Sequence, residues 1–356
     1  MGTFPTYGNI PKIRGQSSAM KRHQTTIVDI AKALNISKST VSRALTNHPN
    51  INPDTKQKVL EIAEKLDYQK NFLSVSLVSK KTNSIGIIVP ELMSSFFPKL
   101  INGVQTVANS KGYHLVICNS NENYLTEVDN TKIMLANQVD GLLVSITKET
   151  QNFDHLKIFQ RKGIPLVFFN RICEDFEVPK VIVDDFEGAF RAVEHLIKRG
   201  KKRIAHLSGP PNLLICEQRL AGYKAALKKY NIPLIEELII PYDLTIAKVK
   251  IYIKHLLSLE NPPDAVFAIN DPTAIEAIQQ IKIMGLRIPE DVAVVGFSND
   301  DVSALVDPPL TTVNQPVTEI GTTAAELVID QIQKDPSEWK AFIKVLKTEL
   351  LVRQTS

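Results

Sequence analysis

The side chains with the clearest chemical purpose near the start of the chain are basic or carry hydroxyls, and they gather on one face of a short predicted helix. That face carries Lys38, Ser39, Ser42 and Arg43. Lysine and arginine donate hydrogen bonds to phosphate oxygens and base edges, and serine hydroxyls donate to phosphates as well. These residue types at this spacing therefore indicate a surface that contacts a nucleic acid.

Three amphipathic helices are predicted to position this surface. The first and third repeat apolar residues at i, i+3, i+4 and i+7: Ile27, Ile30, Ala31 and Leu34, then Val59, Ile62, Ala63 and Leu66. Ser37 can cap the second helix, and Asn52-Pro53-Asp54 is typical of a helix start. Two helices with a short joint and a third as support form a helix-turn-helix, whose second helix enters the major groove. The spacing alone also fits a small helical bundle that packs on another protein.

Charge favours one of these two interpretations. Residues 1–82 hold 13 Lys and Arg against 5 Asp and Glu, a net charge of +8. The rest of the chain holds 29 against 33, a net charge of −4. A basic head on a mildly acidic body is expected when only the head meets phosphate. The helix-turn-helix interpretation is therefore preferred.

From residue 84 onward, short apolar runs alternate with amphipathic stretches of helix length. The runs are 85–89, 115–118, 142–144, 167–169, 181–183, 204–207, 265–268 and 292–295. Such runs are typical of parallel strands buried on both faces, so the alternation predicts a doubly wound α/β body. About nine strands are more than one such sheet holds comfortably.

Polar side chains follow these runs, where open parallel sheets bind their ligands. They include Ser94, Ser95, Asn119, Ser120, Asn121, Asn170, Arg171, Arg219, Asn270, Asp271, Ser298 and Asn299. Such groups, with Phe96 and Phe97 nearby, suit a small polyol or sugar. Structural roles stay open for several of them. Phe96 and Phe97 can cover the core, Arg171 can form an ion pair, and Asn270, like Asp185, can cap a helix.

Several other classes of function find no support. Three widely spaced cysteines and seven scattered histidines give neither a disulfide framework nor a metal-ligand spacing. No serine elbow or phosphate-loop motif occurs, and adjacent acids such as Asp300-Asp301 are interpreted as solvated charge. We therefore expect no catalytic residue, no metal and no cofactor. No apolar run reaches the roughly 18 residues of a membrane span, and residues 1–20 lack the core of a signal peptide. An odd number of widely spread cysteines fits a reducing compartment, so we expect a cytoplasmic location.

Longer blocks of sequence resemble one known family. The headpiece of the lactose/galactose repressor family of bacterial transcription factors is similar to DIAKALNISKSTVSRALTNHP and KVLEIAEKLDY. Successive parts of that family's ligand-binding body, which is of the periplasmic-binding-protein type, resemble SIGIIVPELMSSFFPKLINGV, RLAGYKAAL, AVFAINDPTAIEAI, GLRIPEDVAVVGFSN and PPLTTVNQP. The resemblance spans about residues 25–353.

The resemblance implies a division of the chain. It places a helix-turn-helix domain over 23–69, a hinge segment over 70–82 and an effector-binding and dimerisation domain over 83–356. Residues 1–20 hold Gly, Pro, Ser and Asn without periodicity, so a disordered tail is expected over 1–22. The effector-binding domain is expected to form two lobes, one from about 83–181 and 311–340 and the other from about 182–310 and 341–356. The chain would cross between them near residues 182, 311 and 341.

The resemblance also implies residues that bind DNA. Base edges are expected to meet Lys38, Ser39 and Arg43, and phosphates to meet Thr26, Ser37, Ser42 and Asn47. Leu77 matches the hinge leucine that wedges between base steps in the minor groove. The hinge departs from the family's pattern, because Lys70 replaces the usual proline and Ser74-Val75 replaces the usual Ala-Arg pair. A plain tether is the alternative.

For the effector, the family's contacts match Phe96, Arg219, Asp271 and Ser298, although aspartate often stands in place of Ser298. Together with neighbouring strand ends, this predicts an effector site made of Ser95, Phe96, Asn121, Arg171, Arg219, Phe267, Asp271 and Ser298. A sugar or sugar derivative is the expected ligand.

The resulting prediction is a ligand-controlled transcriptional regulator, a repressor by resemblance, that binds a pseudo-palindromic operator in the nucleoid as a homodimer. Dimer contacts are expected from helices near 97–111 and 317–332. Lobe closure around the effector is expected to shift the dimer interface and the hinge. The alternatives are a pure solute receptor, which the basic head argues against, and an enzyme, which the lack of catalytic motifs argues against.

Overall fold

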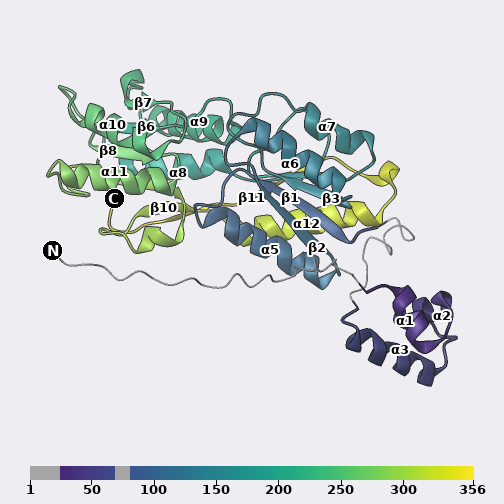
Figure 1. Cartoon of the computed structure of the whole chain (residues 1–356). Helices are drawn as coiled ribbons and strands as arrows, with labels where there is room; N and C mark the ends of the chain where they lie inside the picture. The colour runs from purple at the N-terminus through teal and green to yellow at the C-terminus, as the bar shows by residue number, and fades with distance from the viewer. Residues whose placement is uncertain (1–24, 69–80) are drawn as a thin grey trace, which may run out of the picture. The chain divides into compact units, whose positions relative to one another are not determined.

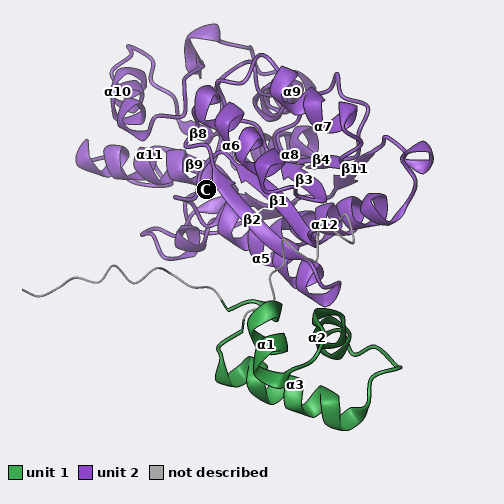
Figure 2. Ribbon diagram, turned by 45° about the vertical axis from the view of Figure 1, so that its right-hand side comes forward, with its two compact units in different colours: residues 1–80 green, residues 81–356 purple. Residues whose placement is uncertain are grey.

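The computed structural model describes residues 25–68 and 81–356 of the chain, which divides into two compact units, residues 1–80 and 81–356 (Figure 2). The predicted tail over 1–22 lies outside the described residues, as do residues 70–80 of the predicted hinge with Leu77. The three predicted helices fall in the first unit, and the predicted α/β alternation falls in the second.

The first unit has the three helices that the apolar spacing predicts: α1 (Ile27–Leu34), α2 (Lys38–Leu45) and α3 (Pro53–Lys65). Polar side chains satisfy the free N–H groups at the helix starts. Ser37 Oγ accepts from the Thr40 N–H at 3.1 Å, and Asn52 Oδ1 accepts from the Asp54 N–H at 2.8 Å. One small core joins the helices and contains Ile30, Ala31, Val41, Ala44, Val59 and Ala63. This is the predicted helix-turn-helix arrangement.

The second unit contains two six-stranded sheets (Figure 1). The first has the order β11–β5–β4–β3–β1–β2 and is built from β1 (Ser84–Val89), β2 (His114–Asn119), β3 (Gly141–Val144), β4 (Leu166–Phe169), β5 (Lys180–Val183) and β11 (Ile343–Leu346). The second has the order β12–β10–β9–β8–β6–β7 and is built from β6 (Ile204–Leu207), β7 (Ile239–Ile240), β8 (Ala265–Ala268), β9 (Ala293–Ser298), β10 (Thr311–Asn314) and β12 (Glu349–Leu351). The strand pairs are parallel except β10–β12, which is antiparallel.

Helices cover both faces of each sheet, as expected for a doubly wound fold. The first sheet packs against α5 (Phe96–Ser110) and α12 (Val317–Gln333) on one face, and against α6 (Tyr124–Ala136) and α7 (Asp154–Arg161) on the other. The second sheet packs against α8 (Asp185–Lys198) and α9 (Leu214–Lys229), and against α10 (Ile246–Leu257) and α11 (Asp271–Ile283). Short 3-10 turns are η1 (Glu236–Leu238), η2 (Asp301–Ala304) and η3 (Pro336–Glu338). Each sheet with its helices is one lobe.

The chain crosses between the lobes three times, after Val183, after Asn314 and after Leu346. These crossings lie later than the positions near 182, 311 and 341 that the sequence suggests. The reason is that β10 completes the second sheet beside β9, and β11 completes the first beside β5, before the chain crosses. Both strands are short, and neither is a continuous apolar run, so the strand pattern did not separate them from the crossings.

Close helix pairs stiffen both lobes. In the first lobe, a Cβ on Gly321 of α12 would lie 2.2 Å from the Leu100 carbonyl oxygen of α5. In the second lobe, a Cβ on Gly222 of α9 would lie 2.3 Å from the Phe186 carbonyl oxygen of α8. Only glycine permits backbones to approach this closely. Among residues 25–68 and 81–356, no helix is long and apolar enough to cross a lipid bilayer.

Candidate functional site

The outward face of α2 carries the residues predicted to read DNA bases. Lys38, Ser39 and Arg43 are exposed, as is Ser42 beside them. On the opposite face, Val41 is fully buried against the other two helices. An exposed helix face with two cations and two hydroxyls, supported from behind by apolar packing, suits the width and chemistry of a major groove.

The residues predicted to meet phosphates lie mostly at helix ends. Thr26 and Ser37 occupy the N-cap positions of α1 and α2, where the helix dipole attracts anions. The Thr26 hydroxyl donates to Asp29 Oδ2 at 2.7 Å. Asn47, beyond the end of α2, has φ 57° and accepts a hydrogen bond from Lys56 Nζ at 2.5 Å. Lys56 is a cation outside the predicted DNA-contacting set, because no helical spacing links it to α2.

A cavity of about 560 Å³ lies between the lobes of the second unit. It stands at the carboxyl ends of strands from both sheets, where such folds bind ligands, and its volume is ordinary for a small-molecule site. Its polar lining includes Glu91, Ser94, Glu122, Lys148, Asn170, Arg171, Arg219, Asn270, Glu276, Ser298, Asp300 and Gln315. Its apolar lining includes Met93, Phe96, Phe97, Ile215, Leu244, Ile246, Ile269, Pro272, Ile275 and Val302. This mixture suits a ligand with hydroxyl groups and an apolar face.

Four of the eight residues predicted for the effector line this cavity: Phe96, Arg171, Arg219 and Ser298. Phe267 is instead fully buried in the core of the second lobe, where its ring stacks on His206 with centroids 4.7 Å apart. Asn121 adopts φ 50° in the turn after β2, and its Oδ1 accepts from Asn119 Nδ2 at 2.6 Å. Both side chains therefore contribute to local packing or turn structure outside the cavity lining.

The remaining two, Ser95 and Asp271, organise the rim of the cavity. The Ser95 N–H donates to Asp300 Oδ2 at 3.1 Å, which joins the first lobe to the second. Asp271 is fully buried and accepts from the Asp300 N–H at 2.8 Å and from Ser303 Oγ at 2.6 Å. Burial raises the pKa of Asp271 above its usual range, although these hydrogen bonds oppose the rise. Interpreting Asp300 as solvated charge was wrong, because its carboxylate joins the two lobes.

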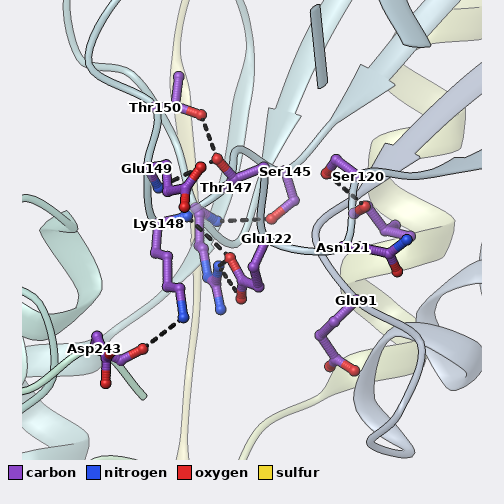
Figure 3. Close-up of polar contacts among 12 residues, drawn as sticks. Glu91, Ser120, Asn121, Glu122, Ser145, Thr147, Lys148, Glu149, Thr150 and Asp243 are labelled. Carbon is purple, nitrogen blue, oxygen red and sulfur yellow. Dashed lines mark hydrogen bonds and ion pairs between the residues drawn. The ribbon is translucent and has the colours of Figure 1, made fainter. Parts of the chain in front are cut away.

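A largely buried ion pair forms part of the first lobe's side of the cavity. Arg171 Nη1 donates to both carboxylate oxygens of Glu122 at 2.8 Å, and the two side chains are only 9% and 20% exposed. Glu122 also accepts from the Lys148 N–H at 3.0 Å, while Lys148 Nζ reaches the Asp243 carbonyl of the second lobe at 2.7 Å (Figure 3). Arg171 therefore forms an ion pair, which was one of its two predicted roles, and also lines the cavity. Glu122 lies 49 residues away in the sequence, so no spacing signal identified it.

Arg219 is held by three different kinds of contact in the second lobe. Its Nε and Nη2 both donate to Asp185 Oδ1, at 2.8 and 2.7 Å, and its Nη1 donates to the Ile269 carbonyl. Its guanidinium carbon lies 3.6 Å from the centroid of the Phe297 ring, a cation–π contact. The Arg219 and Asp185 side chains are 3% and 6% exposed. The ring and the ion pair therefore fix the guanidinium at the cavity wall.

The helix caps settle two structural alternatives. Asn270 does cap α11, because its Oδ1 accepts from the Thr273 N–H at 3.0 Å. Asp185 is not a cap, since Asp184 caps α8 by accepting from the Glu187 N–H at 2.9 Å. Within the described residues, no group of three or more His, Cys, Asp and Glu side chains is arranged to hold a metal ion.

Two family models match the sequence. Residues 26–71 match the model described as bacterial regulatory proteins, lacI family. Residues 82–347 match the model described as periplasmic binding proteins and sugar binding domain of LacI family. The two matches fall on the helix-turn-helix unit and on the two-lobed unit, respectively.

Similar proteins agree with these matches. The HTH-type transcriptional repressor CytR of Escherichia coli (strain K12) is 34% identical over 318 residues, which are 88% of this chain and 92% of that protein. A solved complex of the transcriptional regulator CelR with cellobiose is similar with a TM-score of 0.72 and 26% identity, over 93% of this chain and 100% of that one. A lac repressor dimer bound to operator and the anti-inducer ONPF has a TM-score of 0.82 over 94% of this chain and 99% of that one, and at 24% identity this likeness shows the fold.

Proposed function

The chain belongs to the lacI family of bacterial regulatory proteins, and on that premise we propose that it represses transcription from a pseudo-palindromic operator under the control of a small-molecule effector. The exposed basic face of α2 carries this proposal. Helix-turn-helix proteins insert such a face into the major groove, where arginine and lysine read guanine.

Separate sets of residues contact the bases, the phosphates and the minor groove in this proposal. Base edges are contacted by Lys38, Ser39 and Arg43, and the phosphate backbone by Thr26, Ser37, Ser42 and Asn47. Leu77, in a hinge over 70–82, enters the minor groove and wedges between base steps. The DNA-binding domain spans 23–69, and the effector-binding and dimerisation domain spans 83–356.

The operator is bound by a homodimer. One helix-turn-helix covers only a half-site, so two copies related by a twofold axis are needed for a specific sequence. The lac repressor of similar fold is a dimer on its operator. We place the dimer contacts on helices near 97–111 and 317–332.

The effector is a sugar or sugar derivative that binds in the cavity between the lobes. The relative CelR is solved with cellobiose, and the cavity of this chain offers hydroxyl-binding groups beside Phe96 and other apolar side chains. Ligand that favours the closed lobes shifts the dimer toward one of its two DNA-binding states. The protein acts in the cytoplasm by binding alone, without catalysis.

Selection of binding sites from a random palindromic library, followed by titration of the best site, tests the proposal. Arg43→Ala is expected to weaken operator binding by roughly 1–3 kcal/mol, because a bidentate contact to guanine is lost. The same variant should lose much less affinity for scrambled DNA of equal length, measured at the same salt concentration. Lys65→Ala at the end of α3 is the matched control, since it removes one positive charge from the same unit.

Two outcomes would count against this assignment. Equal losses on operator and scrambled DNA would remove Arg43 as a base reader. Failure of the wild-type protein to enrich any symmetric site would refute the proposed function itself.

A further inference from the structure

The cations that line the cavity already have partners. The Arg171 guanidinium is paired with the Glu122 carboxylate, and the Arg219 guanidinium is paired with the Asp185 carboxylate. The Lys148 ammonium donates to the Asp243 carbonyl at 2.7 Å (Figure 3). An anionic ligand would have to compete with these internal partners, which are held at hydrogen-bond distance in a partly desolvated site.

The charge that remains around the cavity is negative. Its lining contains the carboxylates Glu91, Glu122, Glu276 and Asp300 against the cations Lys148, Arg171 and Arg219. Just outside the lining, Asp185 pairs with Arg219 and Lys250 Nζ lies 3.9 Å from Glu276 Oε1, so these two neighbours cancel and the net charge stays negative. A phosphate or carboxylate on the ligand would therefore meet a net repulsion, which is stronger in a cavity than in open water.

Within the described part of the chain, two buried atoms of the lining have no hydrogen-bond partner, one a donor and the other an acceptor. Arg171 Nε is a donor, and Gln315 Oε1 is an acceptor. Their residues are 8% and 4% exposed, so bulk water does not replace the missing bonds freely. A hydroxyl group both donates and accepts, whereas an ionised phosphate or carboxylate offers acceptors only. Hydroxyls of a bound ligand can satisfy both atoms.

We infer that this cavity selects an uncharged, hydroxyl-rich ligand, an unphosphorylated sugar, over the phosphorylated or carboxylated form of the same sugar. The inference rests on the proposed function in one respect, that the cavity is the effector site. It narrows the effector by charge, because both forms of the sugar carry hydroxyls that can reach the unpaired donor and acceptor, but only the charged form must compete with Glu122 and Asp185 for the two guanidinium groups.

Matched ligand pairs test this selection on the full-length protein. Thermal shift and calorimetry would compare D-glucose with its phosphate monoester and with gluconate, and D-ribose and cellobiose with their phosphate monoesters. In each pair that binds, the neutral member is expected to bind about tenfold or more tightly than the charged member, or about 1.4 kcal/mol. Tighter or equal binding of the charged members would overturn the inference. So would the absence of binding by every neutral member at millimolar concentration.

A single substitution should shift the selectivity. Glu122→Gln keeps an oxygen acceptor for Arg171 but removes its counter-charge, so the charged members should gain about tenfold relative to the neutral ones. Glu149→Gln is the matched control, because Glu149 is exposed in the same loop as Lys148 and lies outside the cavity lining. An unchanged ratio in folded Glu122→Gln would count against the inference. If that variant does not melt cooperatively, the wild-type pairs alone decide.

Measuring operator binding on the same protein preparation separates the selection of neutral sugars from the proposed function as a regulator. A protein that binds a symmetric site but prefers phosphorylated sugars would refute the charge selection and leave the regulator intact. A protein that prefers neutral sugars but binds no symmetric site would do the reverse.

Discussion

Replacing Asp185 alone should lower the free energy of unfolding of the second lobe more than replacing both Asp185 and Arg219. In the Asp185→Leu variant the Arg219 guanidinium keeps the Ile269 carbonyl and the Phe297 ring but loses its carboxylate partner. Because the Arg219 side chain is 3% exposed, water cannot replace that partner. An uncompensated buried charge of this kind costs about 3–5 kcal/mol in the free energy of unfolding.

The double variant Asp185→Leu with Arg219→Met leaves no buried charge and roughly preserves the volume of the pair. Its main loss is the donor to the Ile269 carbonyl, an unsatisfied acceptor that costs about 1–3 kcal/mol. We therefore expect the double variant to be more stable than the Asp185→Leu variant. The two changes should be coupled by several kcal/mol.

Urea unfolding of the wild type, both single variants and the double variant gives this coupling as a double-mutant cycle. Far-UV circular dichroism reports the transition. A loss of stability in the double variant equal to the sum of the losses in the two single variants would contradict this expectation. That result would mean that Arg219 and Asp185 are stabilised independently of each other.

Three further predictions concern pH, lobe closure and helix packing. Burial lowers the pKa of His206 from 6.5 to about 4, so the neutral imidazole stabilises the fold fully above pH 6.5 and this stabilisation is lost as the pH falls through 4. Urea titrations should therefore show the free energy of unfolding of the wild type falling by about 3 kcal/mol over this window relative to that of His206→Gln. Asp300→Ala removes the acceptor for the Ser95 N–H across the lobes, so calorimetry should show sugar binding weakened about fivefold to tenfold, and unchanged affinity would exclude this contact from closure. Gly321→Ala places a Cβ against the Leu100 carbonyl and should cost about 1–3 kcal/mol, seen as a lower melting temperature that Thr322→Ala on the same helix does not show.

The elements that sequence predicted best are those with strong local signals. Helices α1 and α3 follow from their apolar stripes, and α2 follows from Ser37 as its cap. The buried strands follow from continuous apolar runs. By contrast, β10 and β11 are identified as strands by their pairing with β9 and β5. A short stretch of sequence does not encode pairing with a distant segment, so these two strands could not be predicted locally.

The cavity shows the same limit at the level of side chains. The predicted strand ends border the cavity, and Arg171 and Arg219 line it there. Their carboxylate partners, Glu122 and Asp185, lie 49 and 34 residues away in the sequence, and nothing in their local pattern distinguishes them from surface acids. The position of Asp271 after β8 predicts a place near the ligand, but its hydrogen bonds to the rim form only when α11 and the loop after β9 are brought together.

The two close glycine contacts bear on how this protein can move. Gly321 seats α12 directly on the backbone of α5, and Gly222 seats α9 on the backbone of α8. Sliding either helix along its partner would drive backbone into side chains within a tightly packed layer, so shear inside a lobe is disfavoured. Displacement is then concentrated in the three segments that follow Val183, Asn314 and Leu346. We therefore expect the lobes to turn about these segments as rigid bodies when a ligand draws them together.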